Sequence, residues 1–249
     1  LGAAAMGADD PAALLKVIQS TEASDVDRAN AFEKIGDIAG EDAVEPLVAF
    51  LGDKKWSHYA RFALQKMEGE KVTRALLGSL DTLDGDLKLG VITTIGRRCD
   101  PIATVPLAKL LGNADAKVAG AAAVALGWIG TTDAAAALTE AVGAEKDAKR
   151  KESLASAMLL VGQRLARAEN TQAAIDVFDL LRVAEVSKAC RIGATQNAIL
   201  ARGAQGVDLM VEQLKSSDPD CFQTGLAVSR ILPGEPATKG LTDSLDAEA

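Results

Sequence analysis

The sequence predicts an all-α protein in which short helices pair and the pairs stack into an α-α superhelix, or solenoid. Hydrophobic residues make up 48% of the chain and aromatic residues only 3%, so the core must be built from Ala, Leu, Val and Ile. Only seven prolines occur, and alternating runs of β-branched and aromatic residues, which indicate strands, are nearly absent. Similar segments also recur along the chain, which is typical of repeat proteins.

The repeat is clearest where VEPLVAFLGD, residues 44–53, recurs as TVPLAKLLGN at 104–113, sixty residues later. This distance equals two units of thirty. Related segments occupy 72–81, 134–143 and 207–216. A second segment, apolar at i, i+3, i+4 and i+7, follows each of them after a short polar break, so each unit is predicted to be a helix pair.

The clearest second helix is predicted at residues 115–130. An apolar stripe runs along it, formed by Val118, Ala122, Leu126 and Ile129. Asp115 is placed to cap its N-terminus, because a carboxylate there accepts hydrogen bonds from unpaired amides and suits the helix dipole. Gly130 is predicted to end the helix in the left-handed conformation.

This pattern predicts about seven helix pairs, of which the fifth is the longest. Their expected ranges are 10–39, 41–67, 70–99, 101–130, 132–168, 170–202 and 204–233. A single pair cannot bury its apolar stripe alone, whereas stacked pairs form a continuous core. Residues 9–249 are therefore expected to form one solenoid.

The two ends of the sequence leave alternatives open. Residues 1–8, LGAAAMGA, are compatible with the remnant of a secretory signal or with a flexible tail. At the other end, a further first helix is predicted to begin at Glu235 without a partner helix. This segment either caps the stack or indicates a piece of a longer protein, and we favour the second alternative.

The charge excludes several classes of partner. The formal net charge is −8, with 35 acidic against 27 basic residues, which opposes binding to a phosphate backbone or an anionic lipid surface. No apolar run approaches the roughly 20 residues that cross a bilayer. We therefore expect neither a nucleic-acid partner nor membrane insertion.

Residues that carry catalytic or metal chemistry are scarce. His58 is the only histidine, and Cys99, Cys190 and Cys221 are far apart without a CxxC pair, which predicts buried or half-buried thiols. One imidazole and three scattered thiols do not make a typical zinc or iron site. We also find no phosphate-binding glycine loop or HExxH motif. The sequence thus predicts no catalytic residue, no metal and no cofactor.

Rare residue types cluster at 56–64, WSHYARFAL, and make this segment the main candidate binding site. The candidate contact residues are Trp56, His58, Tyr59 and Arg61. Two interpretations stay open: an aromatic plug between repeats with His58 bonded to a neighbouring turn, or contact with a ligand or peptide. On the same helix, the side chains expected to face the core are those of Ala60, Ala63, Leu64 and Met67.

Two further features of the second helices have alternative interpretations. Trp128 either faces a groove and contacts a partner or fills the gap left by small neighbours. Arg61 and the pair Arg97 and Arg98 occupy corresponding ends of successive second helices. They either form a small basic strip or favour the carbonyls at helix C-termini.

The second-helix pattern resembles the HEAT repeat, in particular the short form named after phycobilisome lyases. The residues that carry this resemblance are Asp115, Val118, Ala122, Ala123, Leu126, Gly127, Ile129 and Gly130. The family usually has Arg after the second-helix Val, but this chain has Ala119, which implies fewer polar links between repeats. Segments 57–64, 90–100, 198–203 and 231–234 further resemble exported bacterial multi-repeat proteins, which implies a periplasmic or extracellular location; the alternative is cytoplasmic.

These observations favour a non-catalytic scaffold whose second helices line a concave wall. That wall is expected to bind a protein partner or to position an adjoining enzyme domain. The alternatives are an enzyme or enzyme subunit similar to a phycobilin lyase, which would need a pocket for a small ligand, and a structural assembly protein that packs through its repeat ends. The oligomeric state is not predicted.

Overall fold

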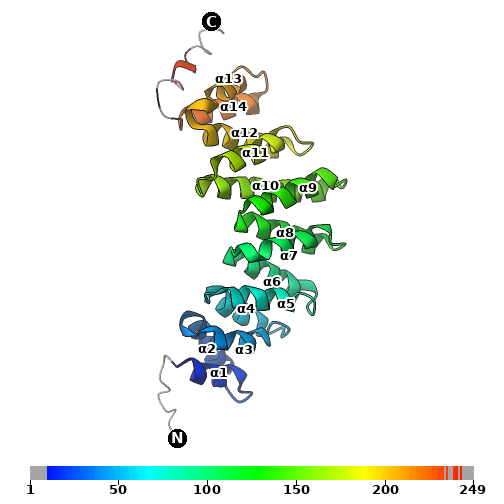
Figure 1. Ribbon diagram of the computed structural model, residues 1–249, viewed down its shortest axis with the longest axis vertical. Helices are drawn as coiled ribbons and strands as arrows, with labels where there is room; N and C mark the ends of the chain where they lie inside the picture. Colours follow the sequence, from blue (N-terminus) through cyan, green and yellow to red (C-terminus); the bar gives the residue numbers. More distant parts are fainter. Residues whose placement is uncertain (1–9, 233, 235–237, 241, 243–249) are drawn as a thin grey trace. The chain divides into compact units, whose positions relative to one another are not determined.

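The computed structural model describes residues 10–232, 234, 238–240 and 242. Within these residues every regular element is a helix, and the predicted all-α class is confirmed (Figure 1). The leader or tail proposed for residues 1–8 and the start of the further helix at Glu235 lie outside the described residues.

The α-helices form seven consecutive pairs, as predicted. In chain order the pairs are α1 (Pro11–Gln19) with α2 (Asp25–Ile38), α3 (Val44–Val48) with α4 (Ser57–Lys66), α5 (Glu70–Ser79) with α6 (Gly85–Arg98), α7 (Thr104–Lys109) with α8 (Ala116–Ile129), α9 (Thr132–Ala144) with α10 (Ala148–Arg167), α11 (Thr171–Arg182) with α12 (Lys188–Arg202), and α13 (Val207–Leu214) with α14 (Pro219–Ser229). Short 3-10 helices adjoin the first helices of three pairs, at Glu41–Ala43, Pro101–Ala103, Leu110–Gly112 and Gly203–Gly206. The predicted length of the fifth pair is confirmed, because its second helix has 20 residues.

The chain divides into two compact units, Leu1–Ala125 and Leu126–Ala249. In the first unit the second helices α2, α4 and α6 pack in sequence against one another, and the first helix α3 packs against α5. In the second unit α10, α12 and α14 pack in the same way, and α9 contacts α11. Each unit is thus built from a layer of first helices and a layer of second helices (Figure 1). That residues 9–249 form a single domain stays a prediction.

Local signals set where the helices begin and end. The Asp115 carboxylate accepts a hydrogen bond from the Lys117 amide at 2.8 Å, which confirms the predicted cap of α8. Gly130 ends the helix with φ of 70°, as expected for a left-handed residue. Side chains also cap other helices, among them those of Asp10, Ser24, Thr131, Asp147 and Ser187.

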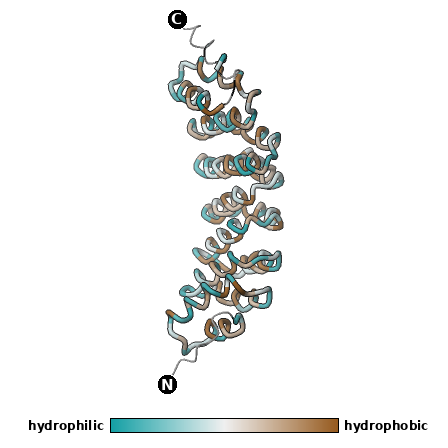
Figure 2. Tube along the Cα trace, turned by 90° about the vertical axis from the view of Figure 1, so that its left-hand side faces the viewer, coloured by the Kyte–Doolittle hydropathy of each residue, from teal (hydrophilic) through white to brown (hydrophobic). Residues whose placement is uncertain are grey.

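Small residues bring neighbouring helices close together. A Cβ atom on Gly36 of α2 would lie only 2.9 Å from the backbone of Ala63 in α4, so this contact requires glycine. The predicted inward residues of α4 are all buried: Ala60, Ala63, Leu64 and Met67. Hydrophobic and hydrophilic residues alternate along the helices, as expected for amphipathic helices (Figure 2). Of the described helices, none is long and apolar enough to span a bilayer.

Candidate functional site

The candidate segment begins with a tight turn that sets the start of α4. The Asp53 carboxylate accepts hydrogen bonds from the backbone amides of Lys55, at 2.7 Å, and Trp56, at 3.0 Å. These bonds satisfy two amides that precede the helix and direct the Trp56 side chain back toward α2.

Trp56 forms part of an aromatic cluster between the first two helix pairs. Its ring stacks on Phe32 of α2, with centroids 5.9 Å apart and planes inclined by 22°, and lies 5.6 Å from the Tyr59 ring. Phe50 packs edge-on against Phe32 at 5.3 Å. Since Phe32 is fully buried, the cluster joins α2 and α4 through apolar contact.

Two cations also lie close to the Trp56 ring. The Arg28 guanidinium lies 4.9 Å and the Lys55 ammonium 5.0 Å from the ring centroid, both within the range of cation–π attraction. Only 5% of Trp56 is exposed, so it occupies the position of the plug and offers a partner almost no surface. Tyr59 is half-buried and His58 is exposed on the same helix.

The exposed side of α4 carries an aromatic residue that we did not single out from the sequence. Phe62 is 44% exposed and stands one helical turn after His58. The Lys66 ammonium lies 4.9 Å from the Phe62 centroid and forms an ion pair with Asp37 of α2 at 2.8 Å. Ile38, which follows Asp37, is 39% exposed. We call these five residues, His58, Phe62, Lys66, Asp37 and Ile38, the Phe62 surface.

A helical projection of the sequence contained the signal for Phe62. Because Ala60, Ala63 and Leu64 face the core, Phe62 must lie on the opposite side of the same helix. The rarity of its residue type favoured Trp56 instead. Trp56 is the most deeply buried aromatic residue of the segment.

Arg61 serves the contact between α4 and α6. Its guanidinium lies across Gly90 and donates to the Gly90 carbonyl at 3.3 Å. A Cβ atom at this glycine would lie 2.6 Å from the guanidinium carbon, so a larger residue here would displace the end of the Arg61 side chain. Arg61 is half-buried, and desolvation lowers its pKa.

Arg98 links the second and third pairs through hydrogen bonds to the C-terminal end of α4. Its Nη1 donates to the carbonyls of Leu64, at 2.7 Å, and Met67. Its Nη2 donates to the Gly69 carbonyl at 2.9 Å, and its Nε donates to the Thr73 hydroxyl at 3.0 Å. Of the two interpretations given for the arginines, binding to helix-terminal carbonyls is therefore confirmed for Arg98, although the helix belongs to the preceding pair.

The remaining sequence candidates lie apart from the Phe62 surface in the chain. Trp128 belongs to the second unit and is half-buried in α8, and its role as a contact residue stays a prediction. Cys190 is buried, while Cys99 and Cys221 are half-buried, and none of these three described residues forms a disulfide. Burial and the Glu152 carboxylate raise the pKa of Cys190. Among the described residues, no three His, Cys, Asp or Glu side chains are grouped to hold a metal ion.

The stacked pairs define a helical-repeat protein, and comparison with known proteins identifies the repeat. The family model for HEAT repeats matches residues 73–158. A crystal structure of importin beta, obtained in a polyethylene glycol condition, has a similar fold with a TM-score of 0.53 and 14% sequence identity. The match covers 94% of this chain and 39% of that one, so the chain spans about two-fifths of the importin beta chain. No curated protein matches the sequence.

Residues 73–158 therefore match HEAT repeats, and the fold is the helical solenoid predicted from the sequence. Solenoids of this kind generally present an extended surface that binds other proteins. The closer resemblance to the phycobilisome-lyase type and to exported multi-repeat proteins stays a prediction.

Proposed function

We propose that the chain is a non-catalytic scaffold that binds a protein partner through the exposed side of its second helices, centred on the Phe62 surface. One observation carries the proposal: a phenylalanine with 44% of its surface exposed lies on the second-helix layer of a chain that has only five phenylalanines. Aromatic residues dominate the energetics of protein interfaces because they bury a large area at a small entropic cost.

The groups around Phe62 suit a protein interface. Ile38 adds a second exposed apolar side chain. Lys66 and Asp37 provide a polar rim, and their two charges pair with each other at 2.8 Å. His58 adds a hydrogen-bonding group one turn away. Tyr59, another of the sequence candidates, is half-buried on the same helix, and we expect it to contribute at the edge of the Phe62 surface.

Comparative capture with matched variants tests the proposal. The wild-type chain and the Phe62→Ala and Val105→Ala variants would each be immobilised and exposed to the proteins of the source organism. Val105 is the control, since it is 63% exposed but lies on the first helix α7. We expect a defined partner to be retained by the wild type and by Val105→Ala and lost by Phe62→Ala. Equal retention by all three would refute the assignment of this surface.

We also propose that the scaffold acts outside the cytoplasm, in a periplasmic or extracellular location, and positions an attached or partner enzyme domain. The support is the resemblance of segments such as 57–64 and 90–100 to exported multi-repeat proteins. Fractionation of cells that express the full gene tests the location, and recovery of the protein only in the cytoplasm would refute it.

A further inference from the structure

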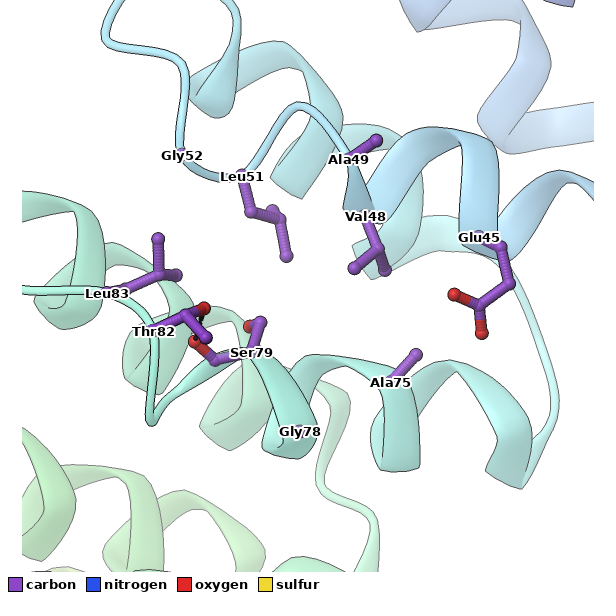
Figure 3. A pocket seen from close by; sticks show the side chains of 10 residues that line it. All are labelled: Glu45, Val48, Ala49, Leu51, Gly52, Ala75, Gly78, Ser79, Thr82 and Leu83. Atoms are coloured by element: carbon purple, nitrogen blue, oxygen red, sulfur yellow. Dashed lines mark hydrogen bonds between the residues drawn. The ribbon is translucent and has the colours of Figure 1, made fainter.

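A cavity of about 540 Å³ opens between the first helices α3 and α5 and the turns that follow them (Figure 3). Its volume lies within the range of known ligand pockets. Small residues create the space: a Cβ atom on Gly78 would meet no atom within 4 Å, and one on Gly52 would meet only Leu83, at 3.9 Å. Ala49 and Ala75 also line it.

The walls of the cavity are mainly apolar. Val48, Leu51 and Leu83 present aliphatic side chains to it (Figure 3). The two hydroxyl groups in the lining already donate within the protein, because Ser79 donates to the Leu76 carbonyl at 2.7 Å and Thr82 to the Ser79 carbonyl at 3.0 Å. The lining therefore favours an aliphatic group that needs no hydrogen bond from the protein.

One end of the cavity carries an uncompensated negative charge. The Glu45 carboxylate lies there, at the opposite end from Leu83 (Figure 3), and has no hydrogen-bond or ion-pair partner among the described residues. The two basic residues of α5 are engaged elsewhere, since Lys71 donates to the Glu41 carbonyl at 3.2 Å and Arg74 pairs with Glu70 at 2.9 Å. A cation is thus the complementary group for this end.

The surrounding sequence has the same sign of charge. The two segments that line the cavity, 45–52 and 75–83, contain two acidic residues, Glu45 and Asp81, and no Lys or Arg. Their combined field attracts positively charged ligands and repels acidic ones.

We infer that this cavity binds a peptide segment of a partner protein in which an aliphatic side chain stands beside a lysine or arginine. The aliphatic side chain fills the space between Val48, Leu51 and Leu83, while the cation pairs with Glu45. This site lies on the first-helix layer and does not depend on the Phe62 surface. The two sites would allow one scaffold to hold two partners.

Selection from a library of random dodecapeptides tests the inference, with the wild-type protein as bait. We expect the enriched peptides to combine an aliphatic residue with an adjacent Lys or Arg. A selected peptide, labelled with a fluorophore, is then titrated with each variant. Gly78→Leu fills the cavity and should weaken binding at least tenfold. Glu45→Gln should weaken it about two- to fivefold, as expected for an exposed charge pair, and raised salt should weaken wild-type binding in the same direction.

Matched variants separate loss of the site from loss of the fold. Gly143→Leu is the control, because Gly143 is also a helical glycine, in α9, whose Cβ would meet no atom within 4 Å. It should bind the peptide as the wild type does, and circular dichroism should show that both leucine variants remain helical. If Gly78→Leu does not fold, Gly52→Leu and Glu45→Lys decide the question by the same titration.

Three results would overturn the inference. In the first, the selection enriches acidic peptides or no peptides at all. In the second, the selected peptide binds Gly78→Leu with unchanged affinity. In the third, Phe62→Ala loses binding while Gly78→Leu keeps it in full. The last result would place the peptide on the Phe62 surface.

Discussion

Removal of the Arg98 side chain should destabilise the first unit, because Arg98 forms the main polar link between the second and third pairs. The Arg98→Ala substitution removes the guanidinium that donates to four acceptors. They are the carbonyls of Leu64, Met67 and Gly69 and the hydroxyl of Thr73. Three of these four acceptors belong to buried residues, and only Gly69 is exposed, so water can replace the lost donor at few of them.

The expected magnitude follows from these contacts. A hydrogen bond to a charged donor contributes about 1.5–3 kcal/mol when buried, but Arg98 is only half-buried and its own desolvation, which lowers its pKa, offsets part of the gain. We therefore expect a loss of about 2–4 kcal/mol in the free energy of unfolding. For a chain of this size, that loss corresponds to a fall of roughly 5–15 °C in melting temperature.

Thermal unfolding followed by circular dichroism measures this effect, and hydrogen exchange locates it. The amides of α4 and α6 should exchange faster in Arg98→Ala, whereas those of α10 and α12 should not change, since stability in solenoids passes between neighbouring repeats. Arg98→Lys should recover less than half of the loss, because one ammonium cannot reach acceptors that a planar guanidinium spans. Melting within about 2 °C of the wild type would refute this account.

Two further predictions concern the aromatic cluster and the second unit. Trp56→Ala should lower the free energy of unfolding by about 3–5 kcal/mol in urea denaturation, as for a buried aromatic, while Phe62→Ala should change it by less than about 0.5 kcal/mol; the reverse order would show that Trp56 is not a core residue. In the second unit, Lys188 forms ion pairs with Asp218, at 2.8 Å, and Asp220, at 2.6 Å. The hydrogen bond that Lys188 donates to Asp218 lowers the pKa of Asp218 below its ordinary 3.8, and the bonds that Lys188 donates to Asp218 and Asp220 raise its own pKa above 10.5. The lowered pKa of Asp218 contributes stability that is present above pH 3.8 and is lost as the pH falls through the folded pKa. The raised pKa of Lys188 contributes stability that is present below pH 10.5 and is lost as the pH rises through the folded pKa. Lys188→Met should therefore lower the melting temperature at neutral pH and reduce the difference between pH 6 and pH 3; an unchanged profile would refute the role of these pairs.

Much of the fold could be predicted because its signals are local. Helix pairs follow from apolar spacing within about fifteen residues, and the ends of α8 follow from Asp115 and Gly130. The thirty-residue period then implies stacking, since each pair needs neighbours to bury its apolar stripe. The order and ranges of all seven pairs were predicted in this way.

The candidate site could be predicted only to the level of a helix. The segment 56–64 does contain the exposed aromatic residue, but the sequence favoured Trp56, which packs onto Phe32, a residue 24 positions earlier in the chain. A preference for rare residues does not distinguish a core aromatic from a contact aromatic, because both uses select large rings.

The sequence by itself determined the all-α class, the seven helix pairs and the inward face of α4, because these depend on propensity and periodicity within a single helix. Only the tertiary structure decided which residues particular side chains contact and where space is left between helices. Arg98 reaches the end of α4, and the small residues Gly52 and Gly78 leave a cavity beside Glu45. These features depend on the distance and orientation between neighbouring pairs, which are set by packing between residues about thirty positions apart.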